Sequence, residues 1–218
     1  MAILKNGILG GSSGKVGPIV TYVSKGKHIM RSYRKKRKKS SVGELASREA
    51  TRLITPVLLS VKRFIKVGFQ LEAALKNTNY YNEAYRYNRK AIVAGSYPDQ
   101  YLDLSNLQVT AGEKPIAKDV HASLNGEYLE FRWNMDAEKT ETKDIDQLIL
   151  VAYCDTPRVV IGVVGGQLRK QGFGRLEVVR FQRTTCVFHT FMAFISEDRN
   201  SVSNTMYAGQ VIVAPDNG

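Results

Sequence analysis

The sequence predicts an α+β fold in two parts: a basic region of hairpin, arm and helices in residues 1–102, then an all-β domain in residues 103–218. Three observations predict it. Two β-prone runs flank a Lys-Gly pair near the N-terminus, and apolar residues then recur at helical spacing. From about residue 103, short apolar runs alternate with turn residues. This change of period predicts the boundary between the two parts.

The first predicted element is a β-hairpin within residues 19–33. Its two β-prone runs lie on either side of Lys25-Gly26, where glycine supplies the positive φ that a tight turn needs. Because an isolated hairpin is marginal in water, this one must pack on the rest of the chain or on a neighbouring subunit.

A glycine-rich stretch precedes the hairpin. Residues 7–18 contain five glycines and a proline, which predicts an irregular loop. It is not a phosphate-binding loop, because Leu9 stands where that motif requires its first glycine. Val16 likewise replaces the Ser or Thr that would hold magnesium, so no nucleotide site is expected here.

Positive charge is concentrated in the first half of the chain. Residues 1–98 carry twenty Lys and Arg, four Glu and no Asp, a net charge of +16, whereas residues 99–218 carry a net charge of −4. Residues 34–39 are six consecutive cations, and their mutual repulsion predicts an extended, exposed arm. Such a run is either a solvated surface or a face that meets a polyanion such as nucleic acid, which it would hold by phosphates without reading bases. The predicted polyanion-binding residues are Lys25, Lys27, Arg31, Arg34, Lys35, Lys36, Arg37, Lys38 and Lys39.

Helices follow the arm. Ser41 and Glu44 form a capping box, and a helical apolar stripe then runs to Ile65. Pro56 predicts a kink or two consecutive helices, and Gly68 predicts a stop. A further helix is expected after residue 79, ending near residue 95. Its tyrosines, interleaved with cations, either form part of a core or stack on nucleic-acid bases, and their shared helical face favours the core.

Seven strands are expected in the second part: Leu107–Thr110, Tyr128–Trp133, Gln147–Cys154, Arg158–Val164, Arg175–Phe181, Val187–Ile195 and Thr205–Val213. Seven short strands in about 110 residues are typical of an immunoglobulin-like or fibronectin-III-like sandwich. Trp133, near the end of an early strand, is expected in its core.

Several stretches carry a resemblance that covers nearly the whole chain. They are Gly7–Gly17, Tyr22–Tyr33 with the basic stretch after it, Ile65–Phe69, Tyr87-Asn88, Ala193–Asp198 and Val202–Asn204. In these stretches the chain resembles an uncharacterised domain-of-unknown-function family of Bacteroidota proteins. That resemblance implies no activity and no catalytic residues. The hairpin, basic stretch and helix also resemble, more loosely, the front end of phage-encoded structural proteins.

No catalytic, metal or cofactor site is expected. Cys186 and His189 are three residues apart on one predicted strand, so they point to opposite faces and cannot share a metal ion without a bulge. Cys154 and Cys186 lie among apolar residues, which favours free buried thiols over a disulfide or a reactive nucleophile.

These observations predict a non-enzymatic structural protein of a self-assembling particle or filament, such as a phage-like capsid or other virion component. Its basic arm would face nucleic acid or a neighbouring subunit, and the chain would form a homo-oligomer. The alternative is a binding module with an immunoglobulin-like domain, either nucleic-acid-associated in the cytoplasm or used for surface recognition. The chain shows no signal peptide and no membrane span. It is therefore expected in the cytoplasm until assembled, and then in a virion or extracellular particle.

Overall fold

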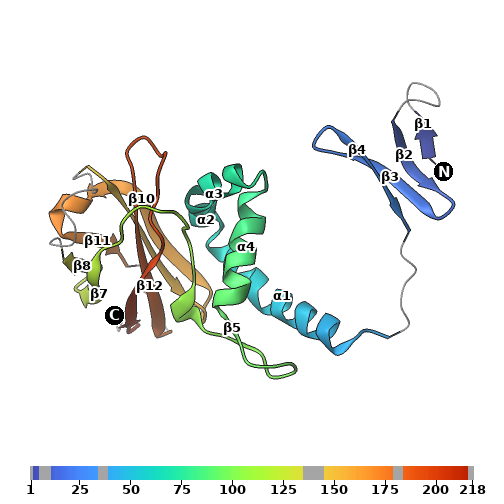
Figure 1. Ribbon diagram of the computed structural model, residues 1–218. Coiled ribbons are helices and arrows are strands. Elements are labelled where there is room, and N and C mark those ends of the chain that lie inside the picture. Colours follow the sequence, from blue (N-terminus) through green and yellow to red (C-terminus); the bar gives the residue numbers. More distant parts are fainter. Residues whose placement is uncertain (1, 5–10, 34–38, 135–144, 179–183, 216–218) are drawn as a thin grey trace. The chain divides into compact units, whose positions relative to one another are not determined.

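The computed structural model describes residues 2–4, 11–33, 39–134, 145–178 and 184–215. Its contacts divide the chain into two compact units, residues 1–41 and residues 42–218 (Figure 1). Both helices and antiparallel strands are present, which confirms the α+β class. Within the described residues, no helix is both long and apolar enough to cross a lipid bilayer.

The N-terminal unit is a four-stranded antiparallel sheet of order β1-β2-β3-β4. Its strands are β1 (Ala2–Leu4), β2 (Ser12–Val16), β3 (Ile19–Ser24) and β4 (Lys27–Ser32). The predicted hairpin is confirmed, since β3 and β4 are joined by Lys25 and Gly26 with φ of 50° and 74°. Two consecutive positive φ values are those of a type I′ turn, whose twist matches that of the strands.

The prediction of an irregular loop in residues 7–18 is wrong for its second half. Residues 12–16 form β2 and pair with β3, where Val16 lies opposite Ile19. Between them Gly17 adopts a φ of 52° beside Pro18, so the two turn-forming residues close a second hairpin. Residues 7–10 lie outside the described part.

The second unit begins with four helices: α1 (Val42–Ser60), α2 (Lys62–Gly68), α3 (Gln70–Leu75) and α4 (Tyr80–Ala91). The expected helix starts after Ser41 and before residue 80 are confirmed. Pro56 does not end its helix, because α1 continues to Ser60 and the break falls at Val61. The side chains around Pro56 explain its tolerance, since Val57 and Leu58 are buried and pack in a shared core. Helix α3 was not expected from the sequence.

Strands make up the rest of the second unit. A short pair, β5 (Val93–Ala94) and β6 (Tyr101–Leu102), follows α4. The longer strands are β7 (Lys118–Asn125), β8 (Tyr128–Asn134), β9 (Gln147–Cys154), β10 (Val159–Leu168), β11 (Phe173–Glu177), β12 (Cys186–Ile195) and β13 (Met206–Val213). Six of the seven predicted strands overlap β8 to β13, although Arg175–Phe181 overlaps β11 only at residues 175–177, and residues 179–181 lie outside the described part. The seventh, Leu107–Thr110, is not a strand: the amides of Val109 and Thr110 both donate to the hydroxyl of Thr205, at 2.9 Å.

These strands form two antiparallel sheets, of order β10-β9-β12-β13 and β11-β8-β7. Side chains alternate along β9, so Ile149 and Val151 enter a core shared with α1, α2 and α4, while Leu148 and Leu150 enter a second core beneath the other sheet. The second unit is thus built as helices, four-stranded sheet and three-stranded sheet, with the helices beside the larger sheet (Figure 1). The boundary predicted after residue 102 falls inside this unit.

The second core contains the single tryptophan, as predicted. Trp133 is 7% exposed and meets the ring of Phe194 edge-to-face, with centroids 5.9 Å apart. Cys154 and Cys186 are both buried and free, which also agrees with the sequence. Burial raises the pKa of the Cys186 thiol to about 11, so this thiol is a poor nucleophile at neutral pH.

Candidate functional site

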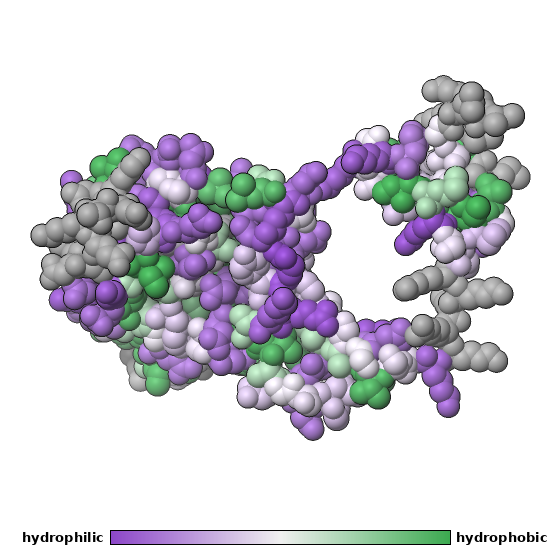
Figure 2. Space-filling view, in the orientation of Figure 1, coloured by the Kyte–Doolittle hydropathy of each residue, from purple (hydrophilic) through white to green (hydrophobic). Residues whose placement is uncertain are grey.

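The N-terminal sheet has almost no interior of its own. Thr21 is the only buried residue among those of residues 1–41 whose side chains are described, at 6% exposed. Large apolar and aromatic side chains stand in solvent instead, and Figure 2 shows hydrophobic residues on the surface of this sheet. Because most of its described side chains are exposed, this sheet gains little of the burial that normally stabilises strands.

Among the residues that the structure describes, one face of this sheet carries no Lys, Arg, Asp or Glu. Residues directly opposite each other across an antiparallel pair lie on the same face, and alternate residues share a face along a strand. Thr21 lies opposite Met30 and Gly14, while Val23 lies opposite His28. The face therefore contains Ser12, Gly14, Val16, Ile19, Thr21, Val23, His28, Met30 and Ser32, and we call it the apolar face. Met30 is 67% exposed and Val23 54%, so its apolar groups are open to contact.

The opposite face carries cations and tyrosines. Val20 lies between Lys15 on β2 and Arg31 on β4, which places the two cations on one side of the sheet. Two ring contacts confirm this placement. The Nζ of Lys15 lies 3.9 Å from the ring centroid of Tyr33, and the guanidinium carbon of Arg31 lies 5.6 Å from that of Tyr22. We call this side the cationic face; it also contains Ser13, Ser24, Lys27 and Ile29.

The structure brings only some of the predicted polyanion-binding residues together. Lys27 and Arg31 lie on the cationic face, and Lys25 lies in the turn between their strand and β3. Lys39 is exposed and outside any strand. Arg34, Lys35, Lys36, Arg37 and Lys38 lie outside the described residues.

Three residues of the cationic face were missed as site residues: Lys15, Tyr22 and Tyr33. Lys15 lies in the glycine-rich stretch, where the sequence predicts a loop, so its pairing with β3 cannot be seen in the sequence. Tyr22 could have been found from alternation, because it shares a face with Ser24 on one strand and with Ile29 and Arg31 on the other.

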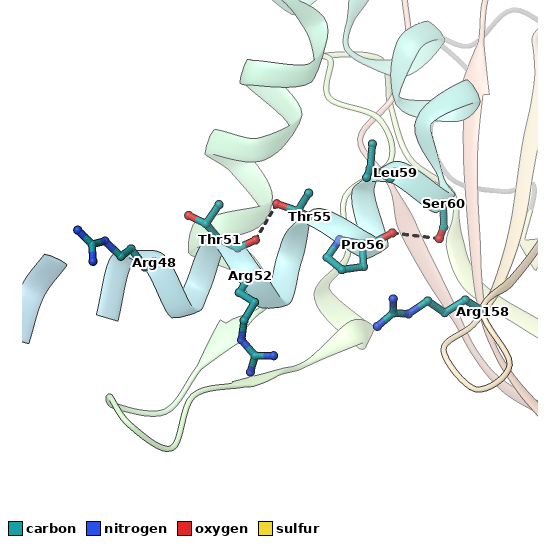
Figure 3. A pocket seen from close by; sticks show the side chains of 8 residues that line it. All are labelled: Arg48, Thr51, Arg52, Thr55, Pro56, Leu59, Ser60 and Arg158. Atoms are coloured by element: carbon teal, nitrogen blue, oxygen red, sulfur yellow. Dashed lines mark hydrogen bonds between the residues drawn. The ribbon is translucent and has the colours of Figure 1, made fainter. Parts of the chain in front are cut away.

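The second unit offers a different surface, an open hollow along α1 (Figure 3). It is lined by Arg48, Thr51, Arg52, Thr55, Pro56, Leu59, Ser60 and Arg158. Its threonine and serine hydroxyls are already used, since Thr55 donates to the carbonyl of Thr51 and Ser60 to that of Pro56. Arg52 pairs with Glu49 at 2.6 Å, and Arg48 points away from the other two arginines. The hydroxyls of Thr55 and Ser60 and the guanidinium of Arg52 are therefore already paired within the chain.

The tyrosines of α4 serve the core. Tyr81, Tyr85 and Tyr87 are partly buried and pack against the core that α1, α2 and α4 share with the four-stranded sheet. The hydroxyl of Tyr87 donates to the carboxylate of Glu72 at 2.6 Å. Their placement agrees with the predicted core role rather than base stacking. Among the described residues, no cluster of three His, Cys, Asp or Glu side chains could hold a metal ion.

The sequence as a whole matches one family model over residues 11–209. The chain belongs to DUF6266, a family of unknown function. The DUF6266 match begins one residue before β2 and ends within β13, so one family model spans β2 to β4 of the N-terminal sheet and nearly all of the second unit. No sequence among curated proteins matches the chain.

Proposed function

We propose that this chain is a non-enzymatic structural protein of a self-assembling particle or filament, such as a virion component. Its N-terminal sheet would join subunits, and its basic arm would face nucleic acid or a neighbour. The observation that carries this proposal is the apolar face, where Val16, Val23 and Met30 are exposed on a sheet that has almost no core. The chain would lie in the cytoplasm until it is built into the particle.

The distribution of charge on the N-terminal sheet favours a second copy of the same chain as the partner of the apolar face. The chain carries a formal net charge of +12, so two copies repel each other wherever their cationic surfaces meet. The apolar face avoids this repulsion, since it contains no Lys or Arg among its described residues. Packing two such faces against each other would bury them in a small sandwich, with both cationic faces outward.

The two sheets of the second unit support a finer fold assignment, an immunoglobulin-like or fibronectin-III-like sandwich. If β7, β8 and β11 are given the letters A, B and E, and β9, β10, β12 and β13 the letters C, C′, F and G, the sheet orders correspond to that fold. The helices on the outer side of the four-stranded sheet are an addition, because they bury a face that such sandwiches commonly leave to solvent.

Size-exclusion chromatography with light scattering tests the assembly. The apolar faces would pair two copies, and further contacts of the chain would join the pairs into the particle, so the parent protein should form oligomers larger than a dimer. Replacing both Val23 and Met30 by serine should break the pairs and reduce it to a smaller species. The matched control replaces Leu75 and Ile212, which are 83% and 65% exposed on the second unit, by serine and should assemble normally. A parent that stays monomeric at all concentrations, or a V23S/M30S variant that assembles like the parent, would contradict the proposal.

The second candidate is a nucleic-acid-associated or surface-recognition module, which the cationic face favours. A monomer that binds a polyanion would support it over the assembly. Size-exclusion chromatography with light scattering therefore distinguishes the assembly protein from the binding module.

A further inference from the structure

We propose that the cationic face of the N-terminal sheet binds single-stranded nucleic acid, with Tyr22 and Tyr33 stacking on bases while Lys15, Lys27 and Arg31 hold phosphates. This inference deepens the proposed function, because it names the ligand that the positive charge would bind. It rests on the proposed function in one respect only: in the assembly, the cationic face must point outward and stay accessible.

Charge is the first argument. Residues 1–43 contain no Asp and no Glu, so no carboxylate of the N-terminal unit neutralises Lys15, Lys27 or Arg31. All three side chains are exposed, on a surface about three strands wide. A face that carries positive charges and no negative charge attracts a polyanion and releases its counterions. Phosphate is therefore the complementary ligand.

The tyrosines are the second argument. Tyr33 is 51% exposed and Tyr22 37%, and each ring is contacted by a cation of the same face. These contacts place a charge for phosphate directly beside a ring for a base. Alternating aromatic and cationic groups are the general means of holding single strands, because every base has a face that can stack.

The spacing of the two rings indicates separate bases. Tyr22 lies opposite Ile29, and Tyr33 follows Ile29 by four residues along the neighbouring strand. At a rise of about 3.3 Å per residue, the two tyrosines are roughly 13 Å apart along the sheet. That distance is too long for one base to be held between the two rings, so each would stack on its own base along an extended strand.

A single strand fits better than a duplex. In a duplex the base faces are stacked on one another, so exposed tyrosines would have nothing to stack on. Base edges in a groove are read by Arg and Lys and by Asn, Gln, Asp and Glu. The described side chains of the cationic face include none of the last four, and its Lys and Arg are assigned to phosphates. Binding should therefore be tolerant of sequence and steep in salt.

The test is fluorescence anisotropy of the full-length protein with labelled oligo(dT), a duplex of equal length, heparin as competitor and vesicles of anionic lipid. Tyr22→Leu and Tyr33→Leu should each weaken oligo(dT) binding roughly 5- to 150-fold, the factor expected for one stacked base. Both variants keep every cation, so a loss of affinity for oligo(dT) would be due to lost stacking and not to lost charge. Tyr101→Leu, which removes a ring 60% exposed on the second unit, is the matched control and should bind as the parent does.

Salt dependence provides the second readout. Replacing Lys15 and Arg31 by glutamine should flatten the slope of log K against log salt by about 1.4 units, from about 0.7 per phosphate contact on single strands. Four results would overturn the inference: no oligo(dT) binding, tighter binding to duplex, binding to vesicles only, or tyrosine variants with parental affinity for oligo(dT). If any of these appeared while the protein still assembled in light scattering, the inference would fail and the proposed assembly would stand. Loss of assembly with intact, tyrosine-dependent oligo(dT) binding would instead support the inference and contradict the proposed assembly.

Discussion

The two units each contain a four-stranded antiparallel sheet, but they bury it in opposite ways. In the second unit, every residue of β9 after Gln147 is buried, because helices cover one face and the smaller sheet covers the other. In the N-terminal unit, β3 and β4 together contain one buried residue, Thr21. Strand propensity and turn chemistry thus suffice to specify pairing, whereas burial decides whether a sheet is stable alone. The contrast supports the proposal that the second unit folds on its own core, whereas the N-terminal sheet is stabilised by a partner.

The largest expected effect comes from the core of the second unit. Trp133→Ala should lower the free energy of unfolding by about 3–5 kcal/mol, since it empties a large buried space beside Phe194. Met30→Ala in the N-terminal sheet is the counterpart and should change it by less than about 0.5 kcal/mol, because Met30 is 67% exposed. Denaturant unfolding of the unassembled protein measures both. Equal losses for the two variants would break the comparison.

The two units also differ in the environment of their charged side chains. Lys114 donates to Asp146 at 2.7 Å, and both side chains are buried, whereas the cations of the N-terminal sheet stand in solvent. Lys114→Met should cost about 3 kcal/mol, at the lower end for a broken buried pair, because Arg169 remains 4.0 Å from the Asp146 carboxylate. Lys15→Met, the exposed counterpart, should leave the unfolding midpoint nearly unchanged. A Lys114→Met variant as stable as the parent would show that this buried pair does not hold the second unit together.

The smallest effect concerns histidine. Burial lowers the pKa of His189, against the opposing charges of Asp103 and Asp155, and its ring meets the hydroxyl of Tyr207 at 3.1 Å. Since the unfolded chain binds this proton more readily, stability should fall as the pH drops through about 6.5, the ordinary histidine value. His189→Gln should flatten this part of the pH profile of thermal unfolding, whereas His28→Gln, on the open N-terminal sheet, is the control. A profile that His189→Gln leaves unchanged would refute the effect.

The sequence predicted local structure better than packing. The sequence predicts the Lys25-Gly26 turn, the start of α4 after Asn79, and six of the seven longer strands of the second unit, because each depends on residues close in the chain. The apolar residues of Leu107–Thr110 predict a strand, and Leu107 and Val109 do face a core. The amides of Val109 and Thr110 bond instead to Thr205, 96 and 95 residues away. Strand β7 was missed because only two of its eight residues are even partly buried, so it lacks a strong apolar pattern.

The candidate site was half predictable for the same reason. The cations of the hairpin were recognised from composition, but their division between two faces depends on register. The glycines of residues 7–18 masked β2, and with it Lys15. Likewise, no local pattern indicates that α1 to α4 and the four-stranded sheet share one core, because that contact joins residues far apart in the chain.

Amide hydrogen exchange of the full chain tests the central claim most directly, that the N-terminal sheet is ordered by a partner and the second unit by its own core. It should be followed by mass spectrometry at a concentration where the protein is unassembled and at one where it is assembled. The account predicts that residues 12–32 exchange at least about tenfold more slowly in the assembly, because binding stabilises the bound form by mass action. Residues 147–154 and 186–195 should be strongly protected in both states. Slow exchange of residues 12–32 in the unassembled protein, equal to that of the second unit, would contradict the account.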